Sequence, residues 1–293
     1  MDDKARLNRR DVQRQFDRAA ATFDTADFVH ALTRQGILTR LEPVLLDTSM
    51  ILDLGAATGG ATAALKKQYG RARIVSVDLS QHMLRRCAKK RRRWSRAAEV
   101  QGDAASLPFA ENSFDLVFAN LLLPWVDTPA TVLKEVARVL RPGGVFAFAT
   151  LGPDSLARLG HAWAQVDSEP HVNLFADMHD VGDALMHAGF SAPVLDVDHL
   201  SVRYDDPQKL FRDLAATGAR NALEHRRRSL TGKGRFSRMV NALAASPGEN
   251  AVEIDLELVY GHCWGTAATR QPTDFRIDAA EVGRRHRARG TAP

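Results

Sequence analysis

The sequence predicts an α/β fold built around an open, mostly parallel, Rossmann-like sheet. From residue 50 onward, short apolar runs alternate with segments of helical periodicity. This alternation is typical of βαβ units, in which consecutive strands lie parallel. The first apolar run leads through a turn of small residues into a helix, and successive runs end in acidic or amide side chains. Because ligands bind beyond the carboxyl ends of parallel strands, these endings indicate a binding site.

Residues 51–60 form the first predicted strand and its loop. The apolar run reaches Asp53, a turn containing Gly55, Ala57 and Gly59 follows, and a helix is predicted at 61–67. Small residues let the backbone approach a ligand, and the helix start offers free N–H groups. No Gly-Lys-Ser/Thr of a phosphate loop follows, and alanine in the middle glycine position makes a poor dinucleotide fingerprint. A purely structural corner is an alternative interpretation of this loop.

Three more strands are predicted at 73–78, 97–101 and 114–119. They lead to Asp78, Asp103 and Asn120 respectively. An acid at the tip of the second strand is placed to accept both hydroxyls of a ribose.

The later elements follow from periodicity and from glycines. We expect a helix at 131–140, ended by Gly143 and Gly144, and a buried strand at 145–151. A helix at 181–188 precedes a strand at 194–204, and the clean alternation of 253–260 predicts a last, antiparallel strand.

Cysteine usage and hydropathy exclude several classes of protein. Only Cys87 and Cys263 are present, and they form no close motif, which predicts no metal site and suits a reducing compartment. No apolar run is long enough to span a membrane, and the N-terminus lacks a signal-peptide core. The sequence therefore predicts a cytoplasmic protein without a membrane partner.

The formal net charge is +5, and the basic residues gather at 85–96, 226–238 and 284–289. Each group is either solvated surface or a docking face for an acidic partner. Aromatic residues are sparse among them and no nucleic-acid-binding motif is present, so we expect no nucleic-acid partner.

The loop and the strand endings belong to a set of motifs that resembles class I S-adenosylmethionine-dependent methyltransferases. The set comprises Leu52-Asp53-Leu54-Gly55-x-x-x-Gly59, Val77-Asp78-Leu79-Ser80, Gly102-Asp103-Ala104, Leu107-Pro108-Phe109, Asn112-Ser113-Phe114-Asp115 and Leu140-Arg141-Pro142-Gly143-Gly144. The motifs cover residues 50–150 in the order of that family. The resemblance implies a seven-stranded sheet and S-adenosylmethionine as cofactor, although Ala57 stands where the family usually has glycine.

The resemblance also implies which residues bind the cofactor. Asp78 is expected to hold the ribose hydroxyls, Asp103 with the backbone of Ala104 to hold the adenine, and the loop at 55–59 to pass beneath the methionine part. The full predicted set is Phe16, Phe23, Asp53, Gly55, Ala57, Gly59, Asp78, Leu79, Asp103, Ala104 and Asn120.

Residues 1–45 are predicted to form a helical lid over that cofactor. Phe16, Ala19, Ala20 and Phe23 recur at helical spacing, and the segment resembles an N-terminal signature of these enzymes. A lid would shield a sulfonium from water, whereas a plain packing face is the alternative. The family usually has tyrosine in place of Phe23, so a hydroxyl is absent here.

Segments outside the core carry a narrower resemblance, to the malonyl-acyl-carrier-protein O-methyltransferase family of biotin synthesis. They include Gly152-Pro153-Asp154-Ser155-Leu156, Pro170-His171-Val172-Asn173-Leu174-Phe175, Gly218-Ala219-x-Asn221 and Val259-Tyr260-Gly261-His262-x-Trp264. The resemblance spans about residues 10–265, with departures at Phe23, Pro124 and Arg220. It implies a methyltransferase domain at 46–265, with insertions at 152–176 and 205–250, followed by a basic tail at 266–293.

This resemblance implies methyl transfer to the free carboxylate of malonyl-acyl carrier protein, giving the methyl ester that primes pimeloyl chain synthesis. Such a carboxylate is ionised at neutral pH, so no general base is expected and positioning carries the catalysis. Arg158 and His171 are candidates to offset the buried carboxylate charge, and Trp125 is a candidate wall of the substrate channel. A structural role is the alternative for His171 and for Trp125.

The acyl carrier protein is strongly acidic, so a basic rim is expected around the channel. The predicted docking residues are Arg226, Arg227, Arg228, Lys233 and Arg235. Two other functions stay open. One is an assembly factor of respiratory complex I of the arginine-hydroxylase type, which shares parts of the insertions. The other is a cofactor-binding module without catalysis, suggested by the Ala56-Ala57 loop.

Overall fold

A single sheet of seven strands organises the part of the chain that the computed structural model describes, which is residues 6–44, 46–90, 97–244 and 251–266. The strand order is β3-β2-β1-β4-β5-β7-β6. The strands are β1 (Met50–Leu54), β2 (Arg73–Asp78), β3 (Ala97–Gln101), β4 (Phe114–Asn120), β5 (Leu140–Leu151), β6 (Phe190–Tyr204) and β7 (Val252–Gly265). Strand β7 runs antiparallel to both its neighbours, and the other pairs are parallel. The predicted fold class is confirmed.

The direction of strand succession reverses beside β1. Strands β2 and β3 follow it on one side, whereas β4 and β5 lie on the other. The apolar residues of β1 from Ile51 to Leu54 are fully buried, because both faces of the strand are covered. A reversal of this kind leaves a crevice at the carboxyl ends of the central strands, which is where ligands bind in such sheets.

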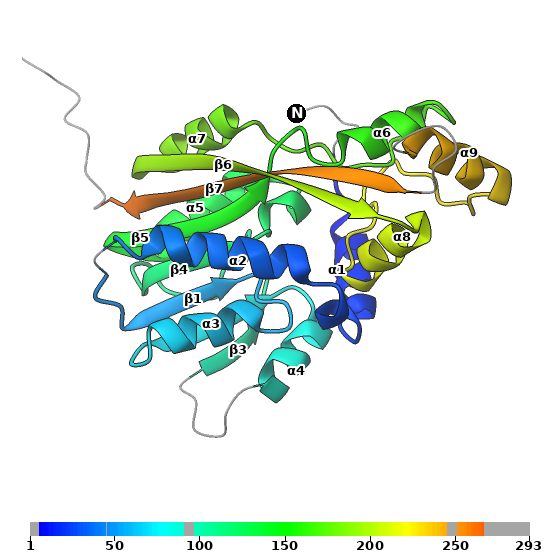
Figure 1. Cartoon of the computed structure of the whole chain (residues 1–293). Helices are drawn as coiled ribbons and strands as arrows, with labels where there is room; N and C mark the ends of the chain where they lie inside the picture. The colour runs from blue at the N-terminus through cyan, green and yellow to red at the C-terminus, as the bar shows by residue number, and fades with distance from the viewer. Residues whose placement is uncertain (1–5, 45, 91–96, 245–250, 267–293) are drawn as a thin grey trace, which may run out of the picture.

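Helices cover both faces of the sheet (Figure 1). Helices α2 (Phe28–Leu41) and α3 (Gly60–Gln68) pack on one face. Helices α5 (Pro129–Val139) and α7 (Met178–His187) pack on the other, and α4 (Gln81–Lys90) contacts β2 and β3. Together these two apolar layers form the core that fixes the strand ends.

The remaining helices gather at one end of the sheet. They are α1 (Arg9–Ala19), the short η2 (Phe23–Thr25) and η3 (Leu123–Trp125), and the insertion helices α6 (Ala157–Ala164), α8 (Pro207–Ala216) and α9 (Lys233–Leu243). Figure 1 shows α1, α8 and α9 to the right of the sheet. Both predicted insertions therefore reach the same end as the start of the chain.

Several element boundaries differ from the prediction; for example, α7 begins at Met178 instead of 181, and β7 continues to Gly265 instead of 260. Helix α5 ends at Val139, because Leu140 is already extended (φ −78°, ψ 136°) and pairs with Phe114. The register then shifts, and Gly143 adopts φ 76° within β5. Strand β6 begins at Phe190, four residues early, because a register shift before Val194 interrupts the alternation on which the prediction relied.

The predicted lid segment divides into two parts. Helix α2 buries Ile37, Leu38 and Leu41 in the main core, so it covers the sheet. Helix α1 and η2 pack in a separate cluster, with Ala19 and Phe23 buried against Met83 of α4. None of the helices in the described ranges has the length and apolar character needed to cross a bilayer. The basic residues at 91–96 and 284–289, and nearly all of the predicted tail, lie outside those ranges.

Candidate functional site

A cavity of about 610 Å³ lies at the carboxyl ends of β1, β2 and β4, and we call it the strand-end cavity. Of the predicted cofactor residues, the following line it: Phe16, Phe23, Gly55, Ala57, Asp78, Leu79, Asp103, Ala104 and Asn120. The fold thus brings together residues from four strand ends and the start of the chain.

The loop after β1 is held in a left-handed conformation. Gly55 has φ 78° and Ala57 has φ 47°. The N–H groups of Gly55 and Ala56 both donate to the carbonyl of Val77, at 2.8 and 3.0 Å. A Cβ added to Gly55 would come within 3.1 Å of the Leu122 side chain. The loop is therefore locked against β2, with its backbone forming one wall of the cavity.

Asp78 is held by backbone donors at the tip of β2. The N–H of Ala57 donates to Oδ2 at 2.9 Å, and the N–H of Ser80 donates to Oδ1 at 2.8 Å. Burial raises the pKa of Asp78 to about 6, despite these hydrogen bonds. A carboxylate has about four acceptor sites, so those not used by the backbone can accept from a ligand.

Asp103 also lines the cavity, but its carboxylate already has partners. The N–H of Ala105 donates to Oδ1 at 2.9 Å. Arg9 of α1 forms an ion pair with Oδ2, with Nε at 2.8 Å. Helix α1 is thus attached to the third strand end by a charged contact.

Two residues predicted to touch the cofactor do not line the cavity. Asp53 is 1% exposed, accepts from the hydroxyl of Thr62 at 2.5 Å, and has a pKa raised to about 7 by burial. Gly59 is the N-cap residue immediately before α3, with φ 85°, and a Cβ there would meet Cys87 Sγ at 2.6 Å. In the structure both residues support the loop from within packed protein, and their predicted contact with the cofactor stays a prediction.

A second cavity of about 580 Å³ adjoins the first, and we call it the apolar cavity. Its walls are mostly apolar and aromatic side chains, many of them from the insertions, with others from β6 and β7. Three residues line both cavities: His30, Leu121 and Trp125. These three define the junction at which ligands in the two cavities would meet.

His30 is a junction residue that the sequence did not reveal. Its ring packs against Phe23, with centroids 4.8 Å apart, and its carbonyl accepts from Asn120 Nδ2 at 2.9 Å. Burial, helped by the nearby charge of Arg34, lowers the pKa of His30 to about 4. The ring is therefore neutral near pH 7. Its Nδ1 is shielded and has no hydrogen-bond partner among the described residues.

The three predicted substrate-orienting residues have different positions. Trp125 lies at the junction, with its ring edge-on to Phe16 at 5.2 Å. His171 lines the apolar cavity, but it stacks on Trp163 at 3.9 Å and bonds to Asp167 at 2.8 Å. Arg158 does not line the cavity and pairs with Glu253 at 3.2 Å, so its predicted role in binding the carboxylate stays a prediction.

The predicted docking residues do not form one free surface. Arg226 Nη1 lies 2.6 Å from Asp11 Oδ2, and Arg228 Nη2 lies 4.0 Å from the same atom. Arg227 donates to the hydroxyl of Ser229 at 2.5 Å. Arg226 is therefore an internal counter-ion, a role that the sequence could not show. Within the described ranges, no group of three His, Cys, Asp or Glu side chains is placed to hold a metal ion.

Comparisons with known proteins agree with this geometry. Residues 52–148 match the methyltransferase domain family. The chain is 40% identical to the malonyl-acyl-carrier-protein O-methyltransferase of Halorhodospira halophila, over 97% of this chain and 99% of that protein. It is 41% identical to the protein of that name from Laribacter hongkongensis, over 88% and 89%. The YcgJ protein of Bacillus subtilis shares the fold, with a TM-score of 0.59 at 16% identity, over 81% of this chain and 100% of that one.

Proposed function

The chain belongs to the malonyl-acyl-carrier-protein O-methyltransferase family, and from this we propose that it methylates the free carboxylate of a malonyl thioester carried by an acyl carrier protein. It is an enzyme, S-adenosylmethionine is its methyl donor, and its product serves biotin synthesis. One observation carries the assignment of the site: two cavities, one at the strand ends and one apolar, meet at three shared residues.

The strand-end cavity fits S-adenosylmethionine. Asp78 keeps free acceptor sites for the ribose hydroxyls, and the left-handed loop at Gly55 leaves space along the backbone. Asn120 Oδ1 is buried without a hydrogen-bond partner among the described residues, so it can accept from the amino group of the methionine part. When bound, the cofactor supplies an electrophilic methyl group on a sulfonium.

The chain itself positions the malonyl carboxylate and excludes water from it. The malonyl carboxylate is ionised at neutral pH, so no proton must be removed before it attacks. His30, Leu121 and Trp125 confine it at the junction and exclude water, which strengthens the attraction between carboxylate and sulfonium. Neutral His30 supplies a ring N–H donor that offsets the desolvation of the carboxylate without carrying a charge of its own.

Helix α1 with η2 acts as the lid over the strand-end cavity. The ion pair between Arg9 and Asp103 and the side chains of Phe16 and Phe23 support this role. We assign docking of the acidic carrier protein to Arg227, Lys233 and Arg235, because Arg226 and Arg228 face Asp11.

Mass spectrometry of carrier proteins tests the proposal directly. With S-adenosylmethionine and purified enzyme, malonyl-carrier protein should gain one methyl group as an ester. Acetyl-carrier protein, which lacks the free carboxylate, is the matched control and should gain none. Equal methylation of both substrates, or modification of a peptide arginine instead, would contradict the proposal. The proteins from Halorhodospira halophila and Laribacter hongkongensis both carry the methyltransferase name, so nothing in them favours the assembly-factor alternative.

A further inference from the structure

A third cavity, of about 450 Å³, opens beside the apolar cavity, and we call it the arginine cavity. We propose that it binds the phosphate of the phosphopantetheine arm on which the carrier protein presents its thioester. The inference rests on the proposed function and deepens it, because it assigns a phosphodiester-binding site to residues outside the methyl-transfer junction.

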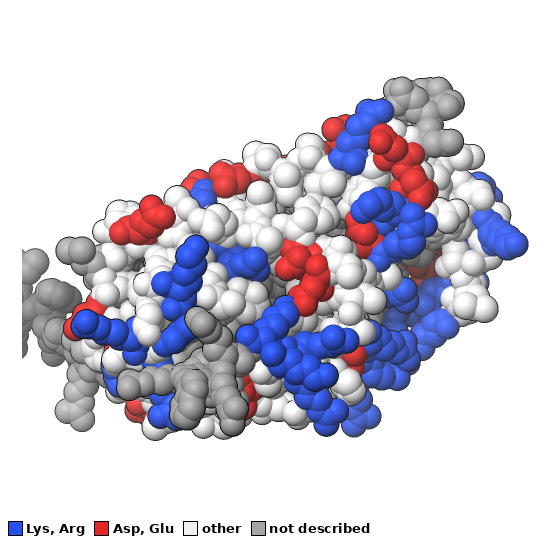
Figure 2. Space-filling model, turned by 60° about the horizontal axis from the view of Figure 1, so that its bottom comes forward, with Lys and Arg blue, Asp and Glu red and all other residues white. Residues whose placement is uncertain are grey.

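The walls of the arginine cavity carry a large excess of positive charge. Five arginines line it, two from α1 and three from the segment between α8 and α9: Arg14, Arg18, Arg220, Arg226 and Arg227. Asp11 is the one acidic residue among the described residues of the lining. Figure 2 shows Lys and Arg gathered densely at the lower right of the surface, the end at which Figure 1 places α1. Such a concave, basic site attracts phosphate groups.

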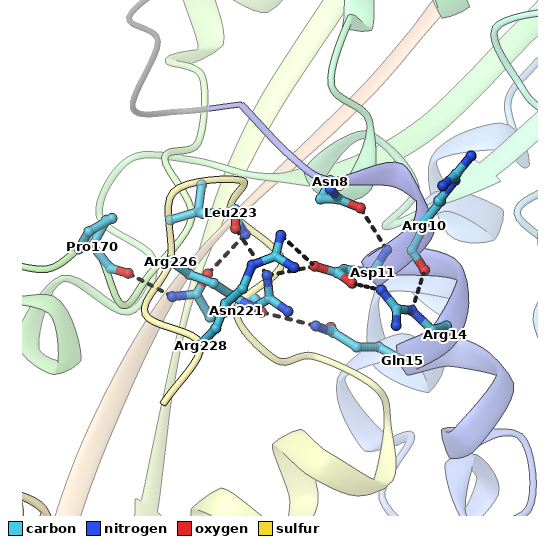
Figure 3. A network of polar contacts seen from close by, with 10 residues as sticks. All are labelled: Asn8, Arg10, Asp11, Arg14, Gln15, Pro170, Asn221, Leu223, Arg226 and Arg228. Carbon is cyan, nitrogen blue, oxygen red and sulfur yellow. Dashed lines mark hydrogen bonds and ion pairs between the residues drawn. The ribbon is translucent and has the colours of Figure 1, made fainter. Parts of the chain in front are cut away.

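Asp11 holds two of the five arginines in place, Arg14 and Arg226. The side chain is 4% exposed and lies between Arg226 and Arg14, which both contact it directly (Figure 3). Its backbone N–H donates to Asn8 Oδ1 at 3.1 Å. Each guanidinium has five N–H donors, so one carboxylate leaves most of them free. The network therefore pre-orients donors for an anion instead of neutralising them.

Asn221 connects the same cavity to two more segments. Its Nδ2 donates to the carbonyl of Pro170 at 2.6 Å, and its own carbonyl accepts from Gln15 Nε2 at 2.9 Å. Figure 3 shows Asn221 between these partners. The walls of the cavity thus come from α1 and both insertions, and hydrogen bonds join these segments to one another.

Arg220 links the arginine cavity to the apolar one. Four residues line both: His171, Arg220, Asn221 and Thr231. Arg220 is exposed, its side chain makes no hydrogen bond or ion pair with the described residues, and it is the one Lys or Arg among those that line the apolar cavity. The arm has its thioester at the inner end and its phosphate at the outer end. With the carboxylate at the junction, the phosphate falls at the outer, basic opening.

Three substrates together isolate the contribution of the phosphate to kcat/KM. They are malonyl-pantetheine, which lacks it, malonyl-phosphopantetheine, and malonyl-carrier protein. We expect Arg220→Gln to lower kcat/KM about tenfold for the two phosphate-bearing substrates, with a several-fold smaller effect on malonyl-pantetheine. Arg18→Gln, whose side chain lines only the arginine cavity, should give the same selective loss. Arg73→Gln, at the opposite, amino end of β2, is the matched control and should change none of the three values.

Calorimetry provides a readout independent of turnover. Free phosphopantetheine should bind the wild type more tightly than pantetheine does, and the difference should shrink in both cavity variants. Equal losses on all substrates, or losses confined to malonyl-carrier protein, would overturn the proposal, because the arginines would then serve the fold or contact the carrier protein's own surface. If the wild type methylates none of the three substrates, the proposed function itself fails, which is a distinct result.

Discussion

The strand-end cavity and the arginine cavity are built in opposite ways. In the first, the hydrogen bonds to Asp78 come from backbone groups within a few residues of a strand end. In the second, side chains from α1 and from the segment after α8 meet around a buried carboxylate, Asp11. The sheet itself therefore creates the cofactor half of the site, whereas the substrate half exists only once distant segments have packed together.

Removing Asp11 should have the largest effect, and this effect should fall on the substrate half of the site and not on the cofactor half. Asp11→Ala leaves the guanidiniums of Arg14 and Arg226 without their shared counter-ion. We expect the free energy of unfolding to fall by about 2–3 kcal/mol, somewhat less than for a fully buried pair. Methylation of malonyl-carrier protein should fall while cofactor affinity is largely kept. Urea denaturation measures the stability, and ligand titration measures the cofactor affinity.

The control for this prediction is Asp205→Ala, which removes an exposed ion pair and should change stability by less than about 0.5 kcal/mol. An equal loss of cofactor affinity in Asp11→Ala would contradict the separation.

The converse experiment removes Asp78. Asp78→Ala deletes charged acceptors for the cofactor, and such hydrogen bonds contribute about 1.5–3 kcal/mol, or roughly one to two decades in affinity. Titration with S-adenosylhomocysteine measures the loss. Binding of free phosphopantetheine, which depends on the arginine cavity, should persist. An unchanged affinity for S-adenosylhomocysteine would remove Asp78 from the site.

The pH dependence should also differ between the halves. The pKa of Asp78 is raised to about 6, so this acceptor becomes protonated as the pH falls through 6. Cofactor affinity should therefore fall about tenfold from pH 7 to pH 5 and be constant above pH 7. Arginines do not titrate in this range, so phosphopantetheine affinity should change only as the phosphate itself titrates.

In the protein without ligand, folding stability should change with pH in the direction opposite to cofactor affinity. The raised pKa values of Asp53 and Asp78 mean that the native state binds protons more tightly than the unfolded chain. The contribution of both groups to stability is fully present below about pH 4 and is lost as the pH rises through 6 to 7. Thermal unfolding of Asp78→Asn and the wild type, compared from pH 5 to pH 8, isolates the contribution of Asp78.

His30 lies between the two halves, so its replacement tests the junction. His30→Ala should lower kcat about tenfold, because the buried carboxylate loses a hydrogen-bond donor, whereas His30→Gln should retain most of the rate. With the pKa of His30 near 4, kcat should be flat from pH 6 to pH 8. Single-turnover rates measure the chemical step. A dependence near pH 7 that disappears in His30→Gln would show that the histidine acts as a base.

The smallest expected effect is at Ala57. The left-handed φ of 47° costs an L-residue about 1 kcal/mol, which glycine avoids. Ala57→Gly should therefore bind S-adenosylhomocysteine equally well or slightly better, and should be stabilised by at most about 1 kcal/mol. Calorimetry and thermal melting measure both values. A clear loss of affinity would mean that the Ala57 methyl group packs against the cofactor.

The sequence predicted the sheet and most strand-end residues because their signals are local. Asp78 ends an apolar run and Asp103 comes one glycine after the next predicted strand, so their place at the sheet edge follows from topology. Predictions that depended on distant partners were less successful. Arg158 pairs with Glu253 of β7, and no pattern in either segment predicts that contact. His30 stood in an expected helix without any motif, so its position at the junction emerged only from tertiary packing.

Helix α1 has a consequence for the order of events at the site. Its Arg9 and Phe16 face the strand-end cavity, whereas its Arg14 and Arg18 face the arginine cavity. The same helix therefore takes part in the binding of two ligands, the cofactor and the acyl arm. A ligand that holds this helix in place lowers the entropic cost of the next ligand, so cofactor and acyl arm should show positive, reciprocal cooperativity.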